Sequence, residues 1–496
     1  MSAWTKNLYS AAQVREIDRI AIEDEGIPAY SLMCRAGAAA YSALRAYWLR
    51  VHRLVVVCGP GNNGGDGYVL ARLAMQDGLA VKLVQVGEES RLNGAARQAA
   101  DEFHAVGGQT LCWNESLLRD ADVVVDGLFG TGLDRPLNHP ILEVAKAMNK
   151  STIPVLALDI PSGLHADTGQ VLGAAVNAEL TVTFIARKLG LYTGEGPELS
   201  GSIMLASLEV PERVTARLEP MARVLDPIMI EQALPPRPRT VHKGDHGRVL
   251  IVGGNHGMPG AACLTAIAAA RTGAGIVEVV TRPAHVAVIV SAQPELLVRG
   301  VMAAGEAAQA IKAADIVAIG PGLGTDRWAS ALLGRVLDTD KPAVWDADAL
   351  NLLARDPVRR DDWILTPHPG EAARLLGVTP REIQNDRYGA VIKLHQRYGG
   401  VVVLKGAGTL VTDGQGPTAV CSAGNPGMAS GGMGDVLTGV IAALVAQGLS
   451  LGQAARMGVL IHAHAADQAA RDGERGLLAT DLLPFVRALV NPKHDG

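Results

Sequence analysis

The sequence predicts an α/β protein made of two doubly wound domains, and three observations support this. Short apolar runs alternate with amphipathic helical patterns along most of the chain. Glycine or aspartate clusters follow nearly every apolar run, as expected where loops leave the carboxyl ends of parallel strands. A proline-rich stretch interrupts the alternation, which then starts again.

The composition narrows the class of protein. The chain has 496 residues, which exceeds the usual size of one domain. Hydrophobic residues make up 48% and charged residues 19%, as in globular proteins with large cores. Lys and Arg number 45 against 50 Asp and Glu, without a long run of one sign, and aromatic residues are only 4%. We therefore expect no nucleic-acid partner.

Cysteine usage and hydropathy predict a cytoplasmic enzyme. The five cysteines are widely spaced and form no CxxC pair, which favours a reduced compartment. The opening residues MSAWTKNLYS contain no apolar core of a secretory signal. The longest apolar stretch, 436–449, is too short and too mixed to span a membrane. A homo-oligomer is compatible with the sequence.

In the first half, a capping box formed by Ser10 and Gln13 predicts the start of a helix that ends at Gly26. Apolar runs then predict strands at 54–58, 81–86, 123–125 and 155–158, and amphipathic patterns predict helices at about 68–77, 94–106 and 141–148.

The stretch 209–240 is rich in proline and is predicted to be a linker with one short helix. We place the boundary near residue 225, giving domains 1–224 and 225–496. In the second half, strands are expected at 249–252, 276–280, 316–319, 343–345 and 401–404, and helices at about 261–271 and from 436 onward.

The first glycine loop follows the strand at 54–58 and reads GPGNNGGDG. Gly59, Gly61 and Gly64 satisfy G-x-G-x-x-G, so one interpretation is a dinucleotide fold with Glu88 as the ribose acid. Asp66 argues against it, because this carboxylate would compete with pyrophosphate for the N–H groups of the helix N-terminus. The side-chain oxygens of this loop suit a hard cation or polar hydroxyls instead.

Two further motifs lie at strand ends in this half. Asp126 lies in DGLFGTGL, and Asp159 and Ser162 lie in DIPSG. Each aspartate alone is more often a turn or cap residue. Since parallel strands bring their carboxyl ends to one edge of the sheet, the three loops together predict a binding site.

These three motifs resemble the N-terminal domain of the YjeF family, the NAD(P)H-hydrate epimerases, over roughly residues 10–215. The resemblance implies a Rossmann-like fold, and it implies that Asp159 contacts the reacting nicotinamide ring, where a carboxylate can move a proton. The implied K+ ligands are Asn63, Asp126 and Ser162. The implied substrate-binding residues are Asn62, Asn63, Gly64, Gly65, Asp66, Gly130, Thr131, Gly132, Leu133, Asp134, Arg135, Pro136 and Asp159.

A second glycine turn, NPGMASGGMGD at 425–435, precedes the helix from Val436. Small residues at a helix N-terminus expose backbone N–H groups and form an anion hole. Asp435 lies at its edge, where it can take a proton from a hydroxyl that attacks a phosphoryl group. The alternative is a simple capping aspartate.

Motifs that follow other predicted strands in the second half also favour a nucleotide-binding site. KGAGT, beginning at Lys405, resembles a nucleotide-contacting turn, and His368 lies in a proline-fixed loop, TPHPGE, that suits ligand contact. Asp346 and Asp348 near a strand end are candidates to place Mg2+. A metal pair of His462 and His464 is not expected, because residues two apart face different sides of a helix.

The second half resembles the ribokinase-like superfamily and, more narrowly, the ADP/ATP-dependent NAD(P)H-hydrate dehydratases, over roughly residues 230–490. The resemblance implies nucleotide binding by Lys405, Gly406, Ala407, Gly408, Thr409 and Gly434. It implies hydrate binding by Ala261, Gly322, His368 and Asp435, with Asp435 catalytic.

The fusion resembles bacterial bifunctional repair enzymes, which implies epimerisation of R and S NADH and NADPH hydrates. It also implies dehydration of the S epimer with ADP as co-substrate and Mg2+, giving AMP and phosphate. Two rivals remain at this stage. The first is a small-molecule kinase, since the G-x-G-D turn is shared, and the second is a binding module without activity in the N-terminal half.

Overall fold

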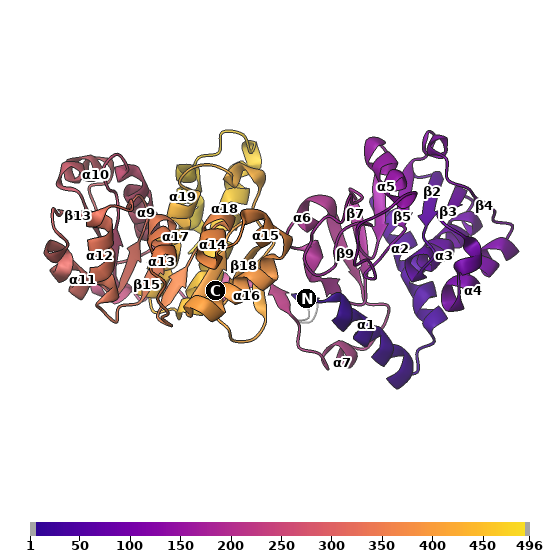
Figure 1. Ribbon diagram of the computed structural model, residues 1–496, viewed down its shortest axis with the longest axis horizontal. Helices are drawn as coiled ribbons and strands as arrows, with labels where there is room; N and C mark the ends of the chain where they lie inside the picture. Colours follow the sequence, from indigo (N-terminus) through magenta and orange to yellow (C-terminus); the bar gives the residue numbers. More distant parts are fainter. Residues whose placement is uncertain (1–5, 492–496) are drawn as a thin grey trace. The chain divides into compact units, whose positions relative to one another are not determined.

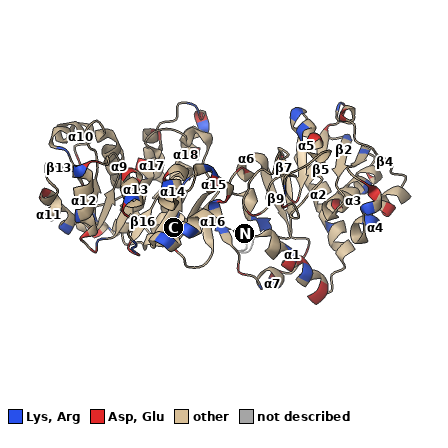
Figure 2. Cartoon of the chain, viewed as in Figure 1, with Lys and Arg blue, Asp and Glu red and all other residues tan. Residues whose placement is uncertain are grey.

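The computed structural model describes residues 6–491, and the chain divides between Arg223 and Val224 into two compact units (Figure 1). Each unit is a parallel or mostly parallel sheet with helices packed against it. The predicted α/β class is confirmed. Lys and Arg residues alternate with Asp and Glu residues along both units, with no long segment of one sign (Figure 2).

The first unit contains a parallel sheet of seven strands in the order β4-β3-β2-β5-β6-β7-β9. The order reverses at β2, so that β3 and β5 lie on its two sides, and such a switch point is where ligands bind in open α/β sheets. The strands are β2 (Arg53–Cys58), β3 (Ala80–Gln85), β4 (Thr110–Leu111), β5 (Val123–Gly127), β6 (Val155–Leu158), β7 (Leu180–Phe184) and β9 (Ser202–Ala206).

The helices of this unit begin largely where the sequence predicts. Ser10 and Gln13 form the predicted capping box of the first helix, which continues as a π-helix at Ile20–Asp24. One prediction was wrong: α3 begins at Asn62, not near residue 68, so the polar half of the first glycine motif forms the helix's first turn. The helices are α1 (Ala11–Arg19), α2 (Ala29–Tyr47), α3 (Asn62–Gln76), α4 (Gly94–Ala105) and α5 (Ile141–Lys150).

The first unit has an apolar core on each face of its sheet, because successive side chains along a strand point to opposite faces. On β2, Leu54 and Val56 belong to one buried cluster, and Val55 and Val57 belong to the other. Strands buried on both faces are expected to be apolar throughout. A small ribbon adds to this unit, in which β1 (Asn7–Tyr9) pairs with β8 (Arg187–Lys188) and with β10 (Ala222–Val224).

The second unit has strands in the order β13-β12-β11-β14-β15-β16-β17-β18-β19. The strands are parallel from β13 to β17, and the last two pairings are antiparallel. They are β11 (Arg248–Val252), β12 (Ile276–Thr281), β13 (Leu297–Gly300), β14 (Ile316–Ile319), β15 (Ala343–Trp345), β16 (Trp363–Leu365), β17 (Val401–Leu404), β18 (Thr409–Thr412) and β19 (Thr418–Cys421).

Two buried helices hold the predicted phosphate turn in place. Helix α17 packs on α9 so closely that a Cβ at Gly439 would lie 2.1 Å from the carbonyl oxygen of Thr265. This contact holds the middle of α17, and with it the turn that precedes the helix, against α9. The helices that surround the sheet are α9 (Pro259–Thr272), α12 (Arg327–Leu337), α13 (Ala347–Arg355), α14 (Pro369–Leu376), α16 (Arg387–Tyr398), α17 (Met433–Ala446), α18 (Leu451–Ala469) and α19 (Leu482–Leu489).

The proline-rich stretch is more ordered than predicted. It holds two short helices and a strand rather than one helix, namely α7 (Glu212–Thr215), β10 and α8 (Ile228–Ala233). Proline at N-cap positions of both helices starts them without costing an internal hydrogen bond. Across residues 6–491, every helix is too short or too polar to cross a membrane.

Candidate functional site

A pocket of about 620 Å³ lies at the carboxyl edge of the sheet in the first unit. The loops after β2, β5 and β6 reach it because these strands are neighbours, with Cys58 opposite Gly127 and Asp126 opposite Ala157. Helices α1 and α2 close its other side. Its polar lining includes Arg15, Asp18, Asn62, Asn63, Asp66, Asn93, Thr131, Asp159 and Lys188.

The first turn of α3 supplies three of these side chains. Asn63 is buried, and its side-chain oxygen and nitrogen both lack a hydrogen-bond partner among the described residues. Unpaired buried amides are costly, so this side chain is a candidate ligand contact. Asp66 is buried as well, and burial, reinforced by the charge of Asp159, raises its pKa well above the ordinary value.

Gly64 and Gly65 have a packing role in this turn and do not line the pocket. A Cβ at Gly64 would lie 2.0 Å from the carbonyl oxygen of Gly59, and one at Gly65 would lie 2.6 Å from Met33. The absence of side chains therefore lets α3 approach the strand end closely.

Asp126 and Ser162 form a buried network behind the pocket. Ser162 donates to Asp126 from its hydroxyl at 2.7 Å and from its backbone N–H at 2.8 Å. Leu128 N–H adds a third hydrogen bond at 3.2 Å. Burial still raises the pKa of Asp126 to about 6, because these hydrogen bonds offset it only in part. The predicted cation ligands Asp126 and Ser162 are thus brought together.

Asp159 is held in an uncommon conformation, with φ of +67°, at the end of β6. Its Oδ1 accepts from the Lys188 ammonium and from the Phe184 N–H at 3.2 Å. Its Oδ2 lies toward Gly130, where a Cβ would be 3.1 Å from it and 3.5 Å from Asn63 Oδ1. Backbone strain of this kind is maintained where the surrounding contacts require it.

The loop after β5 enters the pocket only in part. Gly130, Thr131 and Gly132 line it, whereas the remaining predicted residues of this loop do not. Among those, Leu133 is buried in the neighbouring apolar cluster. Asp134, Arg135 and Pro136 are exposed.

Sequence reasoning missed four polar residues of this pocket, namely Arg15, Asn93, Lys188 and Asp18, and the last two are buried or partly buried charged groups. Lys188 is fully buried in an apolar segment, and nothing in the local pattern marks it. Asp18 has a detectable signal, because it lies four residues after Val14 and three before Ala21, on the helix face that is otherwise apolar. Burial raises the pKa of Asp18 to about 6.

In the second unit, loops after adjacent strands bring Asp346, His368 and Lys405 to one edge of the sheet. Asp346 is buried and accepts hydrogen bonds of 2.8 Å from Lys405 Nζ and 2.8 Å from Thr438 Oγ1. Burial acts to raise the pKa of Asp346, but the charge of Lys405 and these hydrogen bonds outweigh it and lower the pKa.

The second glycine turn, at 425–435, lies next to the ion pair of Lys405 and Asp346. A Cβ at Gly434 would lie 3.2 Å from Lys405 Nζ and 3.5 Å from Asp346 Oδ2. Asp435 follows in the first turn of α17. Burial, together with the negative charge of Asp346, raises the pKa of Asp435 to about 7, although Lys405 opposes the shift. A carboxyl of this kind is suited to proton transfer near neutral pH.

His368 caps helix α14. Its Nδ1 accepts from the Gly370 N–H at 2.9 Å, so in the neutral ring the proton is on Nε2. Burial, reinforced by the charges of Lys405 and Arg374, lowers the pKa of His368 and favours the neutral form. Glu371 completes the capping box, accepting from the His368 N–H at 2.8 Å.

The remaining predicted residues of this unit fall into two groups. Gly322 lies beside Ala261, because a Cβ at Gly322 would be 3.2 Å from the Ala261 Cβ. In the turn 405–409, Gly406 and Ala407 are exposed, Gly408 is buried, and Thr409 Oγ1 donates to the Gly406 carbonyl at 2.8 Å. Gly406 and Ala407 are thus the part of this turn that is exposed next to Lys405.

The carboxylates predicted for magnesium do not form a metal cage. Asp346 is engaged by Lys405 and Thr438, and Asp348 accepts from the Gly324 N–H at 2.8 Å and from Asn351 at 3.2 Å. Among residues 6–491, no group of three or more His, Cys, Asp or Glu side chains is arranged to hold a metal ion.

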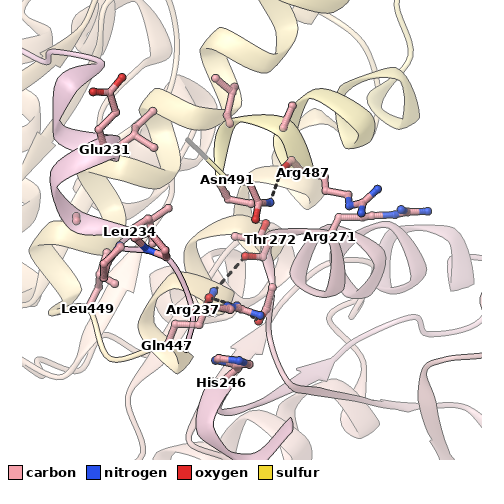
Figure 3. Close-up of a pocket in the computed structure, with 18 of the residues that line it drawn as sticks. Glu231, Leu234, Arg237, His246, Arg271, Thr272, Gln447, Leu449, Arg487 and Asn491 are labelled. Atoms are coloured by element: carbon pink, nitrogen blue, oxygen red, sulfur yellow. Dashed lines mark hydrogen bonds between the residues drawn. The ribbon is translucent and has the colours of Figure 1, made fainter. Parts of the chain in front are cut away.

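The larger cavity of the second unit, about 1400 Å³, contains none of the predicted site residues (Figure 3). It is lined by His246, which precedes β11, and by Thr272 and Gln447, which end α9 and α17. These positions lie at the amino ends of the parallel strands. The cavity is therefore at the opposite edge of the sheet from the glycine turn.

Two family models match the chain. The one for the YjeF-related protein N-terminus matches residues 29–190, and the one for NAD(P)H-hydrate dehydratase matches residues 249–487. Among solved structures, a ribokinase-like superfamily protein from Enterococcus faecalis is 27% identical, with a TM-score of 0.51, over 54% of this chain and 95% of that chain.

Curated relatives match over almost the whole length. The bifunctional NAD(P)H-hydrate repair enzyme Nnr of Coxiella burnetii is 51% identical over 98% of this chain and 99% of its own. The enzyme of the same name from Escherichia coli is 44% identical over 98% and 94%. Matches of this identity over both units show that the chain belongs to the family of bifunctional NAD(P)H-hydrate repair enzymes.

Proposed function

We propose that this chain repairs hydrated NADH and NADPH with its two units. The first unit interconverts the R and S hydrates, and the second dehydrates the S hydrate with ADP, giving AMP and phosphate. The observation that carries the second activity is Asp435, a carboxyl with a pKa of about 7 in the first turn of α17, where free backbone N–H groups favour an anion. Membership of the repair-enzyme family supports both activities.

The chemistry explains the need for a nucleotide. A hydrated nicotinamide ring carries a hydroxyl on C6, and direct loss of hydroxide is slow because hydroxide is a poor leaving group. Transfer of a phosphoryl group to the hydroxyl converts it into a phosphate ester. The lone pair of the ring nitrogen then expels phosphate, and loss of a proton from C5 restores the C5–C6 double bond.

Asp435 is the base in this proposal. Its ionised form takes the proton from the C6 hydroxyl as the hydroxyl oxygen attacks the terminal phosphorus of ADP. The N–H groups of residues 431–434 and the Lys405 ammonium face the transferred phosphoryl group and stabilise its charge. The open turn 405–409 binds the nucleotide, and His368, Ala261 and Gly322 contact the hydrate.

Magnesium is proposed as a partner of the nucleotide phosphates rather than of a protein cage. The hydrogen bonds that engage Asp346 and Asp348 do not suit direct ligation. Mg2+ commonly keeps most of its water and binds through phosphate oxygens with one or two carboxylates. No step of the proposal depends on a particular protein ligand for it.

In the first unit, Asp159 is proposed to contact the nicotinamide ring. Asn62, Asn63 and Asp66, together with Gly130–Gly132, are proposed to hold the substrate. Asn63, Asp126 and Ser162 fit a K+ ion, because the Asn63 amide is unpaired and all three supply oxygen. Such an ion would supply a fixed positive charge beside the substrate. The five free cysteines support the proposed cytoplasmic location.

The first test is an absorbance assay on a mixture of both NADH hydrate epimers, with Mg2+ and ADP or ATP. Complete return of the reduced-nicotinamide signal, faster than spontaneous epimerisation, is the expected result. Recovery that stops after one epimer would remove the epimerase half and favour a binding module. No recovery, with a stable phosphorylated product instead, would replace the dehydratase by a small-molecule kinase.

A further inference from the structure

Asp18 is a carboxyl of the first pocket that the proposed roles above leave without a function. It lies on α1, and its residue lines the same pocket as Asp66, Asp159 and Lys188. Among residues 6–491, its carboxyl group accepts no hydrogen bond, and only burial and the charges of Lys188 and Asp159 act on it. A partly buried carboxyl without a partner, in a pocket that holds the proposed substrate, is available to react with it.

Lys188, the ammonium group of this pocket, forms its hydrogen bonds with groups other than Asp18. Lys188 Nζ donates to Asp159 Oδ1, to Thr183 Oγ1 at 3.0 Å and to the Phe184 carbonyl at 3.0 Å. An ammonium has three N–H donors, so these contacts use all of them. Lys188 is therefore paired with Asp159 and provides no hydrogen bond to Asp18.

Epimerisation at C6 requires two proton transfers. C6 carries both the hydroxyl and the ring nitrogen, so the nitrogen lone pair can form a C6=N bond as the C6–O bond breaks. The leaving oxygen takes a proton from an acid and departs as water. A water molecule then adds to the opposite face of C6 and gives a proton to a base.

The two groups exchange roles when the reaction runs backward. After one turnover the acid has become a carboxylate, and the base has become a carboxyl, which is the state needed for the reverse direction. Two carboxyls that share one proton meet this requirement, and one of them must begin ionised. Asp159, paired with Lys188, is suited to begin as the carboxylate.

We propose that Asp18 is the second proton-transfer residue of the epimerase site and acts as the acid opposite the Asp159 carboxylate. The inference rests on the proposed epimerase function of this unit. It adds a catalytic residue on α1 to the groups that the strand-end loops contribute.

The charges around Asp18 agree with this role. Burial raises its pKa to about 6, Lys188 opposes the rise, and Asp159 adds to it. The Asp18 charge in turn helps to raise the pKa of Asp66. From α1 itself, Arg15 also lines the pocket, and its guanidinium lies 3.5 Å from the Thr131 carbonyl oxygen. A bound ring would remove water and raise the pKa of Asp18 further.

The test uses the full chain, purified R hydrate of NADH and no nucleotide, with the S hydrate measured by chromatography. The wild-type chain must first exceed the spontaneous rate, and failure here would overturn the proposed function itself. Given that activity, Asp18→Asn is expected to lower kcat about 10²-fold or more, with little change in KM. Dehydration of the S hydrate with ADP is expected to stay unchanged.

The matched control is Glu23→Gln, which removes an exposed carboxylate from the adjoining turn, at a residue that does not itself line the pocket. Its epimerisation rate should equal that of the wild type. The wild-type rate should fall as pH rises above about 6, since an acid must carry its proton. In Asp18→Asn, this fall in rate at alkaline pH should disappear. Asp18→Glu should retain partial activity, and the pH at which its rate falls should be displaced.

Two results would overturn the assignment. One is an Asp18→Asn chain that folds and epimerises at the wild-type rate. The other is an alkaline limb that is the same in Asp18→Asn as in the wild type. The melting temperature and the dehydratase rate show whether Asp18→Asn folds. If it does not fold, Asp18→Glu is the test variant. A rate in Asp18→Glu that falls at the same alkaline pH as in the wild type would then contradict the proposal.

Discussion

Lys405 Nζ donates a hydrogen bond of 2.8 Å to Asp346 Oδ1, and this ion pair lies beside the first turn of α17. The pair acts on Asp435 in two opposed ways. The negative charge of Asp346 raises the pKa of Asp435, and the positive charge of Lys405 lowers it. The pair therefore sets the pH at which the proposed base becomes ionised.

In Asp346→Asn, the rise of the dehydration rate with pH should occur at a lower pH than in the wild type. In the wild type, the rate should rise with pH through about 7, because Asp435 must lose its proton to act as a base. Removing the Asp346 charge takes away a repulsion and leaves Lys405 with only the more distant Glu371 carboxylate, 4.0 Å away, and both changes lower the pKa of Asp435. The measurement is the initial dehydratase rate between about pH 5 and 9, a range that extends about two pH units on each side of the wild-type midpoint.

The control for this variant is Asp348→Asn, which removes a carboxylate that binds Gly324 and Asn351 instead. Its pH profile should keep the wild-type midpoint. A midpoint in Asp346→Asn that does not move, or that moves to higher pH, would contradict the electrostatic role of the ion pair.

Asp435→Asn should lower the rate of dehydration by about 10²- to 10⁴-fold, because the amide cannot accept the hydroxyl proton. Epimerisation should continue at the wild-type rate, since Asp435 belongs to the second unit. Normal dehydration by this variant would exclude Asp435 as the base.

The same variant makes a stability prediction. The pKa of Asp435 is raised from 3.8 to about 7 in the folded chain, so its ionisation disfavours folding as pH rises between these values. At pH 8, Asp435→Asn should therefore have a larger free energy of unfolding than the wild type, by an amount on the order of a few kcal/mol, and a higher melting temperature. The difference should shrink below about pH 4, where the wild-type carboxyl is protonated in both states. Equal melting temperatures at pH 8 would show that Asp435 is not buried in this way.

Strand-end motifs could be predicted from sequence because they follow a local rule. Apolar runs that end in glycine and aspartate place Asp126, Asp159 and Lys405 at the edges of parallel sheets, and the structure has them there. The start of α3 could not be predicted in this way. The glycines of its first turn have poor helix propensity, but close packing against Gly59 and Met33 stabilises the turn.

Contacts between side chains that are distant in the sequence could not be predicted from the sequence. Lys188 is separated by 29 residues from Asp159, and Thr438 by 92 from Asp346, so no periodicity relates them. Their roles follow from tertiary packing alone. Asp18 differs, since a lone carboxyl on the apolar face of α1 is visible in the sequence pattern.

Lys188→Met should slow epimerisation and destabilise the first unit. Removing the ammonium leaves the largely buried Asp159 carboxylate without its ion-pair partner, a change that typically costs about 3–5 kcal/mol. Asp159→Ala should also slow epimerisation, while the double variant should be less destabilised than Lys188→Met, because no unpaired charge remains. Thermal unfolding of the four chains measures the coupling. Additive effects would show that the pair does not act as a unit, and an unchanged epimerisation rate in Asp159→Ala would make that residue structural.

Potassium should stabilise the first unit through the unpaired amide of Asn63. If Asn63, Asp126 and Ser162 bind K+, the ion favours the folded state by about 2.7 kcal/mol at a concentration of 100 times its Kd. The melting temperature and the epimerisation rate should therefore both rise when K+ replaces a bulky organic cation at constant ionic strength. Asn63→Ala should lose both responses, because it removes one ligand oxygen.

Asn93→Ala is the matched control for this experiment. Asn93 lines the same pocket but is exposed and is not among the proposed ligands, so its variant should keep the wild-type response to K+. A K+ response that survives in Asn63→Ala, or that vanishes equally in Asn93→Ala, would contradict the assigned ligand set. Measuring the melting temperature separates binding from catalysis, since the ion can stabilise the fold whether or not the epimerase turns over.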